Sequence, residues 1–286
     1  MMNTLSVTDL FALAAVMLIG LPHGAFDGAI AFCLGFGRST GKIIGFLFMY
    51  LLLAGLSALV WSVSPVFALA AFLGLTIVHF GTGDTEHLFQ PGPRLAQRGL
   101  KACQILVHGG MVTILLPVFH TAEVSELFII LAGPNAVLII DALRPALMIW
   151  LAATCIYASV GLVSQRYGAA AGELAALAML VWLLPPLAGF AVYFCVVHSR
   201  RHFASIWKAM QLYISRRFIL ISGGILTAAS WAMGAGLYVS QTTSGSFSAD
   251  EAFIRTVFIL LAALTVPHML LVDTMYRPTL RKITLL

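Results

Sequence analysis

The sequence predicts an all-α, polytopic membrane protein, and three observations lead to this fold class. Of 286 residues, 60% are hydrophobic and 9% are charged, and the mean hydropathy is +0.99. In soluble domains roughly a quarter of the residues are charged, so this composition excludes an ordinary soluble enzyme. Apolar runs of about 20 residues, such as 43–61, are long enough to cross a bilayer as helices. They also lack the residue-by-residue alternation of membrane barrel strands.

Breaks in the hydropathy pattern divide the chain into nine predicted spans, with eight to ten compatible with the pattern. In chain order, the spans are residues 5–36 (interrupted at 20–24), 43–61, 65–80, 100–119, 145–163, 170–184, 186–198, 218–239 and 252–273. The shorter segment 122–133 carries Glu123 and Glu126 and is expected at the membrane interface. No soluble domain, linker or internal repeat interrupts the pattern, so residues 1–286 are predicted to form a single transmembrane helical domain.

The distribution of charge orients these spans. The net charge is +5, from 16 basic and 11 acidic residues, and in a membrane protein such an excess indicates cytoplasmic loops rather than a nucleic-acid surface. The basic segments contain Arg38 and Lys42; Arg94, Arg98 and Lys101; Arg200, Arg201, Lys208, Arg216 and Arg217; and Arg277, Arg281 and Lys282. A helix break at Pro185-Pro186 is needed to put all four on one side. We therefore expect a multi-pass protein of the inner (plasma) membrane with a cytoplasmic C-terminus. The N-terminus lacks a basic leader, so we expect the first apolar stretch to be retained.

Histidines are concentrated in the apolar segments. Six of the eight lie in or at the ends of predicted spans: His23, His79, His108, His198, His202 and His268. Ionisable groups at membrane depth are costly and are functional candidates by default. Any single one could be structural, but the predicted topology brings all six to the cytoplasmic leaflet. Imidazole is a common ligand of iron, zinc and copper, so the pattern indicates one buried metal site.

Two spacings give local support to a metal site. His198 and His202 are four residues apart, which places both rings on one face of an α-helix. Asp27 follows His23 by the same interval and is expected to orient the ring of His23 through the nitrogen that does not bind the metal. Each spacing is common by chance, so their value depends on their occurring together.

Two further histidines stand next to helix breakers. His79 ends an apolar run, and a glycine-rich turn is expected to bring Asp84 close to it. Pro267 opens the helical ladder beside His268. Asp84 could equally mark the point at which its helix leaves the membrane. Arg200 and Arg201 are interpreted as interfacial anchors, and the four cysteines (Cys33, Cys103, Cys155 and Cys195) as small core residues.

These motifs resemble a known family. PHGAFD at 22–27, HFGTGD at 79–84, HSRRH at 198–202 and PHMLLVD at 267–273 occur in the order and approximate spacing of the bacterial and archaeal membrane beta-carotene 15,15′-dioxygenases, the bacterio-opsin-related proteins. The resemblance covers essentially the whole chain. It implies a membrane oxygenase that uses Fe(2+) and dioxygen to cleave the central double bond of beta-carotene into two retinal molecules.

The resemblance also implies particular roles for the histidines. The implied iron ligands are His23, His79, His198 and His202, with Asp27 and His268 as residues that orient ligands. Whether His268 or His108 is itself a ligand stays open at this point. The implied partners are beta-carotene taken from the bilayer, dioxygen and a neighbouring retinal-binding opsin, with no nucleic acid. Aromatic residues near the ligands are candidate walls of the substrate tunnel: Phe80, Tyr193, Phe194 and Phe203.

Two other classes of protein compete with this interpretation. Di-iron desaturases and hydroxylases are also membrane metalloenzymes with histidine ligands, but they carry several clustered histidine pairs in polar loops, whereas this chain has one HxxxH pair and no adjacent histidines. A transporter or channel would need acidic residues along a path through the membrane, and the predicted spans contain almost none. The carotenoid oxygenase is therefore the favoured hypothesis.

Overall fold

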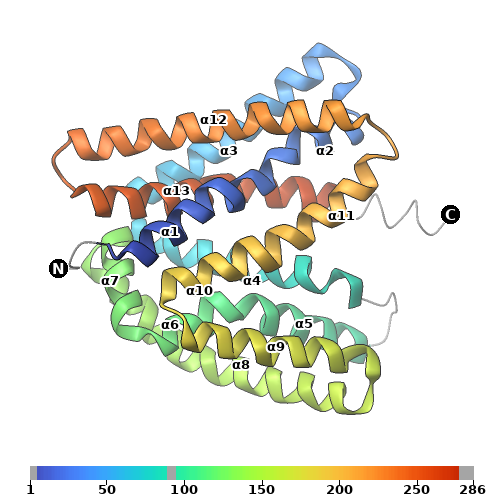
Figure 1. Ribbon diagram of the computed structural model, residues 1–286, viewed down its shortest axis with the longest axis vertical. Helices are drawn as coiled ribbons and strands as arrows, with labels where there is room; N and C mark the ends of the chain where they lie inside the picture. Colours follow the sequence, from blue (N-terminus) through green and yellow to red (C-terminus); the bar gives the residue numbers. More distant parts are fainter. Residues whose placement is uncertain (1–4, 89–94, 277–286) are drawn as a thin grey trace. The chain divides into compact units, whose positions relative to one another are not determined.

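The computed structural model describes residues 5–88 and 95–276, and every regular element in these two ranges is a helix (Figure 1). The predicted all-α class is confirmed. The α-helices are α1 (Val7–Ala15), α2 (Asp27–Cys33), α3 (Thr40–Val63), α4 (Pro65–Thr85), α5 (Leu95–Gly110), α6 (Leu116–Phe119), α7 (Thr121–Ala132), α8 (Val137–Val163), α9 (Gln165–Leu183), α10 (Pro186–Val192), α11 (Arg200–Met210), α12 (Arg216–Thr243) and α13 (Ala249–Met269).

Eight short segments of other helical types connect or extend these helices. Four are π-helical: η1 (Val16–Gly20), η5 (Met111–Leu115), η7 (Tyr193–Ser199) and η8 (Leu270–Tyr276). Four are 3₁₀-helical: η2 (Leu21–Phe26), η3 (Phe36–Arg38), η4 (Glu86–Leu88) and η6 (Pro134–Ala136). The interruption predicted at residues 20–24 corresponds to η2, where Pro22 stands in the first turn of the 3₁₀ segment. Non-α segments of this kind often mark functional sites.

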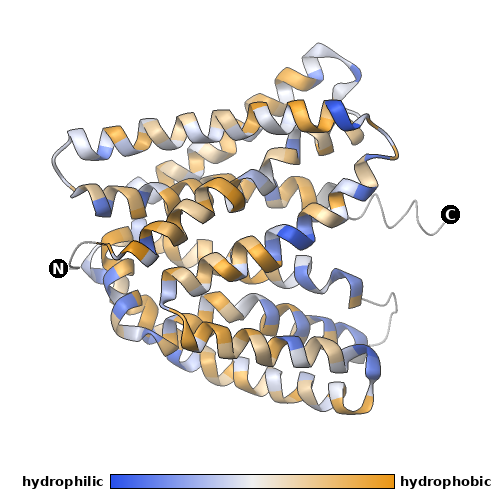
Figure 2. Cartoon of the chain, viewed as in Figure 1, coloured by the Kyte–Doolittle hydropathy of each residue, from blue (hydrophilic) through white to orange (hydrophobic). Residues whose placement is uncertain are grey.

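Seven stretches of the described chain are long and apolar enough to cross a membrane. They are Val7–Cys33, Thr40–Val63, Pro65–Leu88, Gln97–Phe119, Pro134–Val163, Arg216–Thr243 and Ala249–Asp273. In Figure 2 their lengths are mainly hydrophobic, and the hydrophilic residues gather near helix ends and connections. The protein is therefore a multi-pass helical membrane protein.

The helix break expected at Pro185-Pro186 is present, because α9 ends at Leu183 and α10 begins at Pro186. The two helical rods on either side of it, α9 and the run from α10 to α11, are outside the seven candidates. One boundary was wrong: α8 begins at Val137 and passes through Pro145 instead of starting there. A hydropathy criterion misses this first part of the helix because it carries the exposed polar residues Asp141 and Arg144. Their Oδ1 and Nη1 atoms lie 3.4 Å apart.

Serine caps fix the starts of three long helices. The Ser39 and Ser215 side chains accept hydrogen bonds from the backbone N–H groups of Lys42 and Phe218. Ser248 and Glu251 form a reciprocal capping box at the start of α13. Such caps satisfy backbone N–H groups that the helix itself leaves without a partner, and each contributes about 1 kcal/mol. The acidic residues Asp250 and Glu251 therefore lie in the first turn of α13 and mark its start.

By its internal contacts the chain divides into two compact units. The first unit comprises Leu69–Arg201 with the described part of residues 1–12, and the second comprises Leu13–Ala68 with the described part of residues 202–286. The single domain expected over 1–286 stays a prediction. Of the basic residues that oriented the spans, Arg94, Arg277, Arg281 and Lys282 lie outside the described residues.

In the first unit, glycines bring α4 and α5 into close contact. A Cβ on Gly81 would collide with the backbone of Ile105, and one on Gly109 would collide with the backbone of Ile77. The glycine-rich turn predicted after His79 is therefore wrong, because α4 continues to Thr85. Its glycine at position 81 serves the contact between the two helices rather than a change of chain direction.

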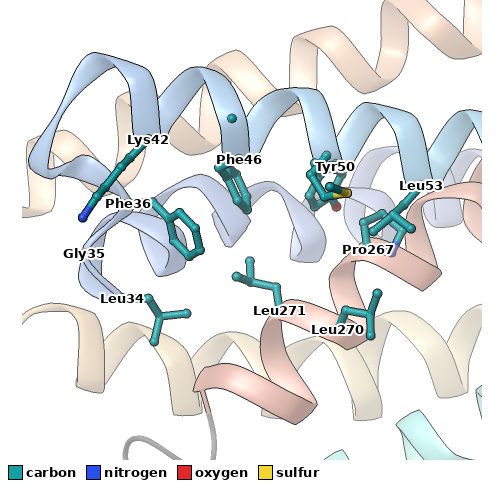
Figure 3. Close-up of a pocket in the computed structure, with 12 residues that line it drawn as sticks. Leu34, Gly35, Phe36, Lys42, Phe46, Tyr50, Leu53, Pro267, Leu270 and Leu271 are labelled. Carbon is teal, nitrogen blue, oxygen red and sulfur yellow. The ribbon is translucent and has the colours of Figure 1, made fainter.

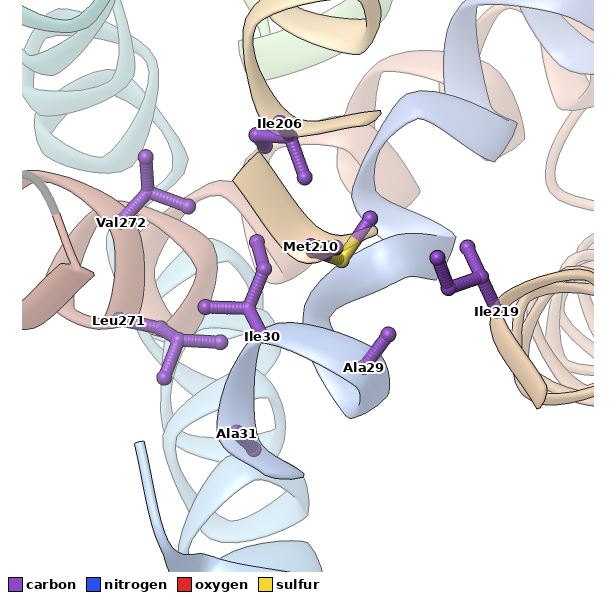
Figure 4. Packing of buried hydrophobic residues seen from close by; sticks show 8 residues of the cluster. All are labelled: Ala29, Ile30, Ala31, Ile206, Met210, Ile219, Leu271 and Val272. Carbon is purple, nitrogen blue, oxygen red and sulfur yellow. The ribbon is translucent and has the colours of Figure 1, made fainter. Parts of the chain in front are cut away.

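Several core residues of the second unit are close in sequence to candidate site residues. Its buried cluster consists of Ala29, Ile30, Ala31, Ile206, Met210, Ile219, Leu271 and Val272 (Figure 4). These residues come from α2, α11, α12 and η8, one or two helical turns from Asp27, His202 and His268. Fully burying each large apolar side chain stabilises the fold by about 1.5–3 kcal/mol, so the backbone next to the polar groups is held firmly.

Candidate functional site

In the first unit, a histidine, an aspartate and a tyrosine form a buried hydrogen-bonded triad. Nδ1 of His198 lies 3.0 Å from Oδ1 of Asp84, and the Tyr193 hydroxyl donates to Oδ2 of Asp84 over 2.7 Å. The three residues are at most 1% exposed. The His79 ring packs edge-on against His198, with ring centres 5.0 Å apart. We call Tyr193, Asp84 and His198 the first triad.

The π-helical geometry of η7 explains how one short segment supplies two groups to Asp84. Tyr193 and His198 are five residues apart, which puts them on different sides of an α-helix but on a similar side of the wider π-helix with its i→i+5 hydrogen bonds. Both can therefore reach the same carboxylate. The Tyr193 hydroxyl also lies 3.0 Å from the carbonyl oxygen of His108, which ties η7 to α5.

Aromatic rings surround the first triad. The ring centre of Phe80 lies 4.1 Å from that of His198, and Phe194 stacks nearly parallel to His198 at 6.1 Å. Phe80 and Phe194 are both buried. Of the predicted tunnel walls in this unit, Tyr193 holds the carboxylate, while these two phenylalanines cover the imidazole.

Arg201, interpreted from the sequence as an interfacial anchor, pairs with Glu173 of α9. Its Nη2 lies 2.6 Å and 2.5 Å from the two carboxylate oxygens. Arg200 is exposed, and its Nε donates to the carbonyl oxygen of Val196. The two arginines therefore differ: one closes a contact within the first unit, and the other has only local contacts among the hydrogen bonds that the structure describes.

The second unit contains a triad of the same composition. Nδ1 of His268 lies 2.8 Å from Oδ1 and 3.0 Å from Oδ2 of Asp27, and the Tyr50 hydroxyl donates to Oδ2 over 2.7 Å. The His202 ring lies 4.9 Å from that of His268, again edge-on. Asp27, His202 and His268 are buried, whereas Tyr50 is half-buried. We call Tyr50, Asp27 and His268 the second triad.

Neighbouring residues pack closely around the second triad. Gly24 lies beside His268, where a Cβ would make an ordinary van der Waals contact with Nδ1 at 3.8 Å. Phe26, next to Asp27, packs edge-on against Phe203 and Trp207 of α11. Phe203, the fourth predicted tunnel wall, thus contacts aromatic neighbours within the second unit.

The structure brings the predicted metal ligands together in pairs. His79 lies with His198, and His202 lies with His268, whose role as a ligand or as an orienting residue was left open. His23 belongs to η2, but its side chain lies outside what the structure describes, and so does its predicted contact with Asp27. Among described side chains, no group of three or more histidine, cysteine or acidic residues is placed to hold a metal ion. The four-histidine site therefore stays a prediction, as does the shared face of His198 and His202, which belong to different units.

His108, whose role as a ligand was left open, makes its ring contact with a tyrosine of the first unit. Its ring meets Tyr157 edge-on, with centres 5.7 Å apart. Within the described chain, neither ring nitrogen of His108 has a hydrogen-bond partner, and the buried Tyr157 hydroxyl also has none. Its link to the first triad runs through its backbone carbonyl group.

Sequence reasoning missed the partners of the two aspartates. Asp84 was weighed as a residue at a helix exit, but it is 1% exposed and holds His198. Tyr50 was not singled out, because a tyrosine inside an apolar run has no distinguishing spacing. The usable signal was an aspartate within each of the motifs that begin with His79 and with Pro22.

Comparison with known proteins decides the family. The model of the family described as beta-carotene 15,15′-dioxygenase matches residues 14–276. The chain belongs to this family. It is 41% identical over 275 residues to a beta-carotene 15,15′-dioxygenase from an uncultured marine bacterium, covering 96% of each chain. It is also 30% identical over 307 residues to a probable beta-carotene 15,15′-dioxygenase of Halobacterium salinarum, covering 96% of this chain and 86% of the relative. No solved structure matches the chain.

The aspartates and histidines of both triads lie within the part of the chain that the family model matches. Both Asp27 and Asp84, with His79, His198, His202 and His268, fall inside the matched residues 14–276. In this member of the family, each of the two units therefore supplies one pair of buried histidines, and in each pair one ring is held by a carboxylate.

Proposed function

We propose that the protein cleaves the central 15,15′ double bond of beta-carotene with dioxygen and releases two retinal molecules. The observation that carries this proposal is the near-full-length similarity to a relative named for that reaction. The apolar helices support it, because beta-carotene is an apolar rod that resides in the bilayer. The buried histidine pairs support a metal-dependent reaction over a transport role.

We propose Fe(2+) as the metal, bound by His23, His79, His198 and His202. The described residues fit such an ion in the spacing of their rings. Metal–imidazole bonds are about 2.0–2.1 Å long, so two rings on one ion keep their centres within roughly 6.5 Å. The separations of 5.0 Å and 4.9 Å meet that condition. Because His268 stands to His202 as His198 stands to His79, His268 is a further candidate ligand.

The two aspartates would prepare the imidazoles for the metal. A carboxylate that accepts from Nδ1–H fixes the ring's tautomer and orientation, so the ring would coordinate through Nε2. Asp84 would act in this way on His198, and Asp27 on His268. Tyr193 and Tyr50 donate to these carboxylates and hold them in place. Bound iron supplies the binding and activation of dioxygen, while Phe80 and Phe194 keep water from the first triad.

For the topology, we propose nine spans with a cytoplasmic C-terminus in the plasma membrane. Beyond the seven candidates, α9 and the run of α10 and η7 would be the additional two. Glu173 on α9 is paired with Arg201, which offsets the cost of both charges near the membrane. Retinal would pass to a retinal-binding opsin nearby, as the resemblance implies.

The test is production of retinal in carotene-producing bacteria. Cells that express the chain with iron supplied should lose colour and accumulate retinal, whereas a matched strain expressing His198→Ala should do neither. Immunoblots of membrane fractions must show equal amounts of both proteins. If the wild-type protein is present in the membrane, iron is supplied and no retinal forms, the proposed function is wrong.

A further inference from the structure

A mainly apolar pocket of about 230 Å³ lies within the second unit, between η2, α3, α12 and α13. All three side chains of the second triad line it, as do aliphatic residues of α3, α12 and α13. The charged groups that line it are Asp27 and, when protonated, His268, and these are bonded to each other. The pocket is therefore an apolar space with polar chemistry confined mainly to one cluster.

The pocket is lined on two sides by residues that face outward. Leu47 and Leu51 of α3 are 40% and 56% exposed, and Met233 of α12 is 40% exposed. On helices that span a membrane, exposed aliphatic side chains face the lipid tails. The space between α3 and α12 is thus a lateral opening from the bilayer toward His268.

We propose that this pocket admits one end of the apolar polyene substrate from the bilayer and holds it against the second triad. This inference rests on the proposed function for the identity of the substrate. A long conjugated hydrocarbon has no polar group to satisfy, so an aliphatic lining suits it along its length. The buried imidazole of His268 is the place where such a chain meets the candidate metal ligands.

A neighbouring pocket in the same unit provides the contrast. It measures about 610 Å³ and shares Phe46 and Tyr50 with the first, as Figure 3 shows for its lining residues. However, it is lined by the cation Lys42 and by neither Asp27 nor His268. A substrate in that pocket would touch the second triad only through Tyr50.

Two methionines make a matched pair of test positions. Met233 lines the smaller pocket and Met49 lines the larger one, and they are 40% and 51% exposed. Met233→Trp should fill the proposed substrate pocket, while Met49→Trp should fill the neighbouring one. Because the tryptophan ring would occupy space that the substrate needs, Met233→Trp should lower kcat/KM for beta-carotene by about tenfold or more, which corresponds to about 1.4 kcal/mol. Met49→Trp should stay within about twofold of wild type.

Binding should be measured without turnover, by the induced circular dichroism of beta-carotene in nanodiscs under anaerobic conditions. Beta-carotene is achiral, so the signal reports carotene held by protein rather than dissolved in lipid. The wild-type and Met49→Trp proteins should give the signal, and Met233→Trp should lose most of it. Ala229→Phe, an exposed change at the same opening, should act like Met233→Trp if the tryptophan variant fails to fold.

The outcomes separate this inference from the proposed function. Wild-type protein that binds carotene but yields no retinal overturns the reaction and leaves the pocket assignment standing. Full binding and activity in both Met233→Trp and Ala229→Phe overturns the pocket assignment, even where the wild type makes retinal. The pocket assignment is also overturned if only Met49→Trp is impaired. It is likewise overturned if Met233→Trp removes bound phospholipid from the purified protein while carotene binding is unchanged.

Discussion

The two units use the same three residue types to hold a buried histidine, and they differ in what surrounds it. In both triads a tyrosine donates to an aspartate over 2.7 Å, and the aspartate holds Nδ1 of a histidine. The second histidine of each pair lies edge-on at nearly the same separation. The first triad is enclosed by phenylalanines, whereas the second lines an apolar pocket and has a half-buried tyrosine. Similar chemistry thus serves an enclosed position and one accessible to substrate.

The largest expected effect tests whether both histidine pairs hold iron. His23→Ala, His79→Ala, His198→Ala and His202→Ala should each abolish retinal formation and strongly lower bound iron, because each would remove a nitrogen ligand. Iron is measured by elemental analysis of purified protein. His268→Ala should follow them if the two pairs are equivalent.

His120→Ala is the matched control for these variants. Its Nε2 is hydrogen-bonded to the carbonyl oxygen of Val181, which belongs to neither triad. The bound iron should therefore be unchanged, and the free energy of unfolding should fall by about 1 kcal/mol. A His198→Ala protein that keeps full iron and activity would remove His198 from the ligand set.

The next effect compares the two carboxylates. Asp84→Asn and Asp27→Asn preserve size but remove the charge behind His198 and His268. Losing such a partner lowers metal affinity about 10- to 100-fold, so iron titration should show a loss of this size in both variants. If only Asp84→Asn weakens iron, the second triad positions His268 for a purpose other than metal binding.

A smaller and unequal effect is expected from the tyrosines. Tyr193→Phe removes a hydrogen bond to a fully buried carboxylate and a second one to the His108 carbonyl group, which should cost about 1.5–3 kcal/mol. Tyr50→Phe should cost about 1 kcal/mol, since Tyr50 is half-buried. Thermal unfolding of the purified proteins in detergent measures both. Equal losses would contradict the contrast between an enclosed and an accessible triad.

Much of the fold was predictable because the membrane imposes a simple rule on the sequence. Long apolar runs gave the helices, and Pro185-Pro186 gave the break between α9 and α10. The start of α8 was missed because exposed charges at Asp141 and Arg144 resemble a loop when hydropathy is the criterion. A helix whose first turns are polar is invisible to that signal.

The candidate site was predictable in its residue types and less so in its pairings. The spacing argument assumed α-helical geometry, whereas His198 lies in a π-helical segment from which it and Tyr193 reach the same carboxylate. Gly81 was interpreted as a turn residue, because a sequence does not reveal that another backbone passes against it. Pairings such as Tyr50 with Asp27 depend on contacts between distant segments, and no local pattern encodes them.

The smallest expected effect concerns the ion pair between Arg201 and Glu173 beside the first triad. The described contacts of the second triad include no such arginine–glutamate pair. Glu173→Gln should lower the free energy of unfolding by less than about 1 kcal/mol, because Arg201 and Glu173 are 24% and 35% exposed and solvent screens their attraction. Iron affinity should be unchanged, since among the described hydrogen bonds the pair meets the first triad through Arg201 Nη1 and the backbone carbonyl group of Asp84, 3.5 Å apart. Arg144→Gln, which breaks the exposed pair with Asp141, is the matched control. Iron titration of Glu173→Gln beside Asp84→Asn gives the answer: equal losses of affinity would make the ion pair part of what holds His198, and the first triad would then extend to α9.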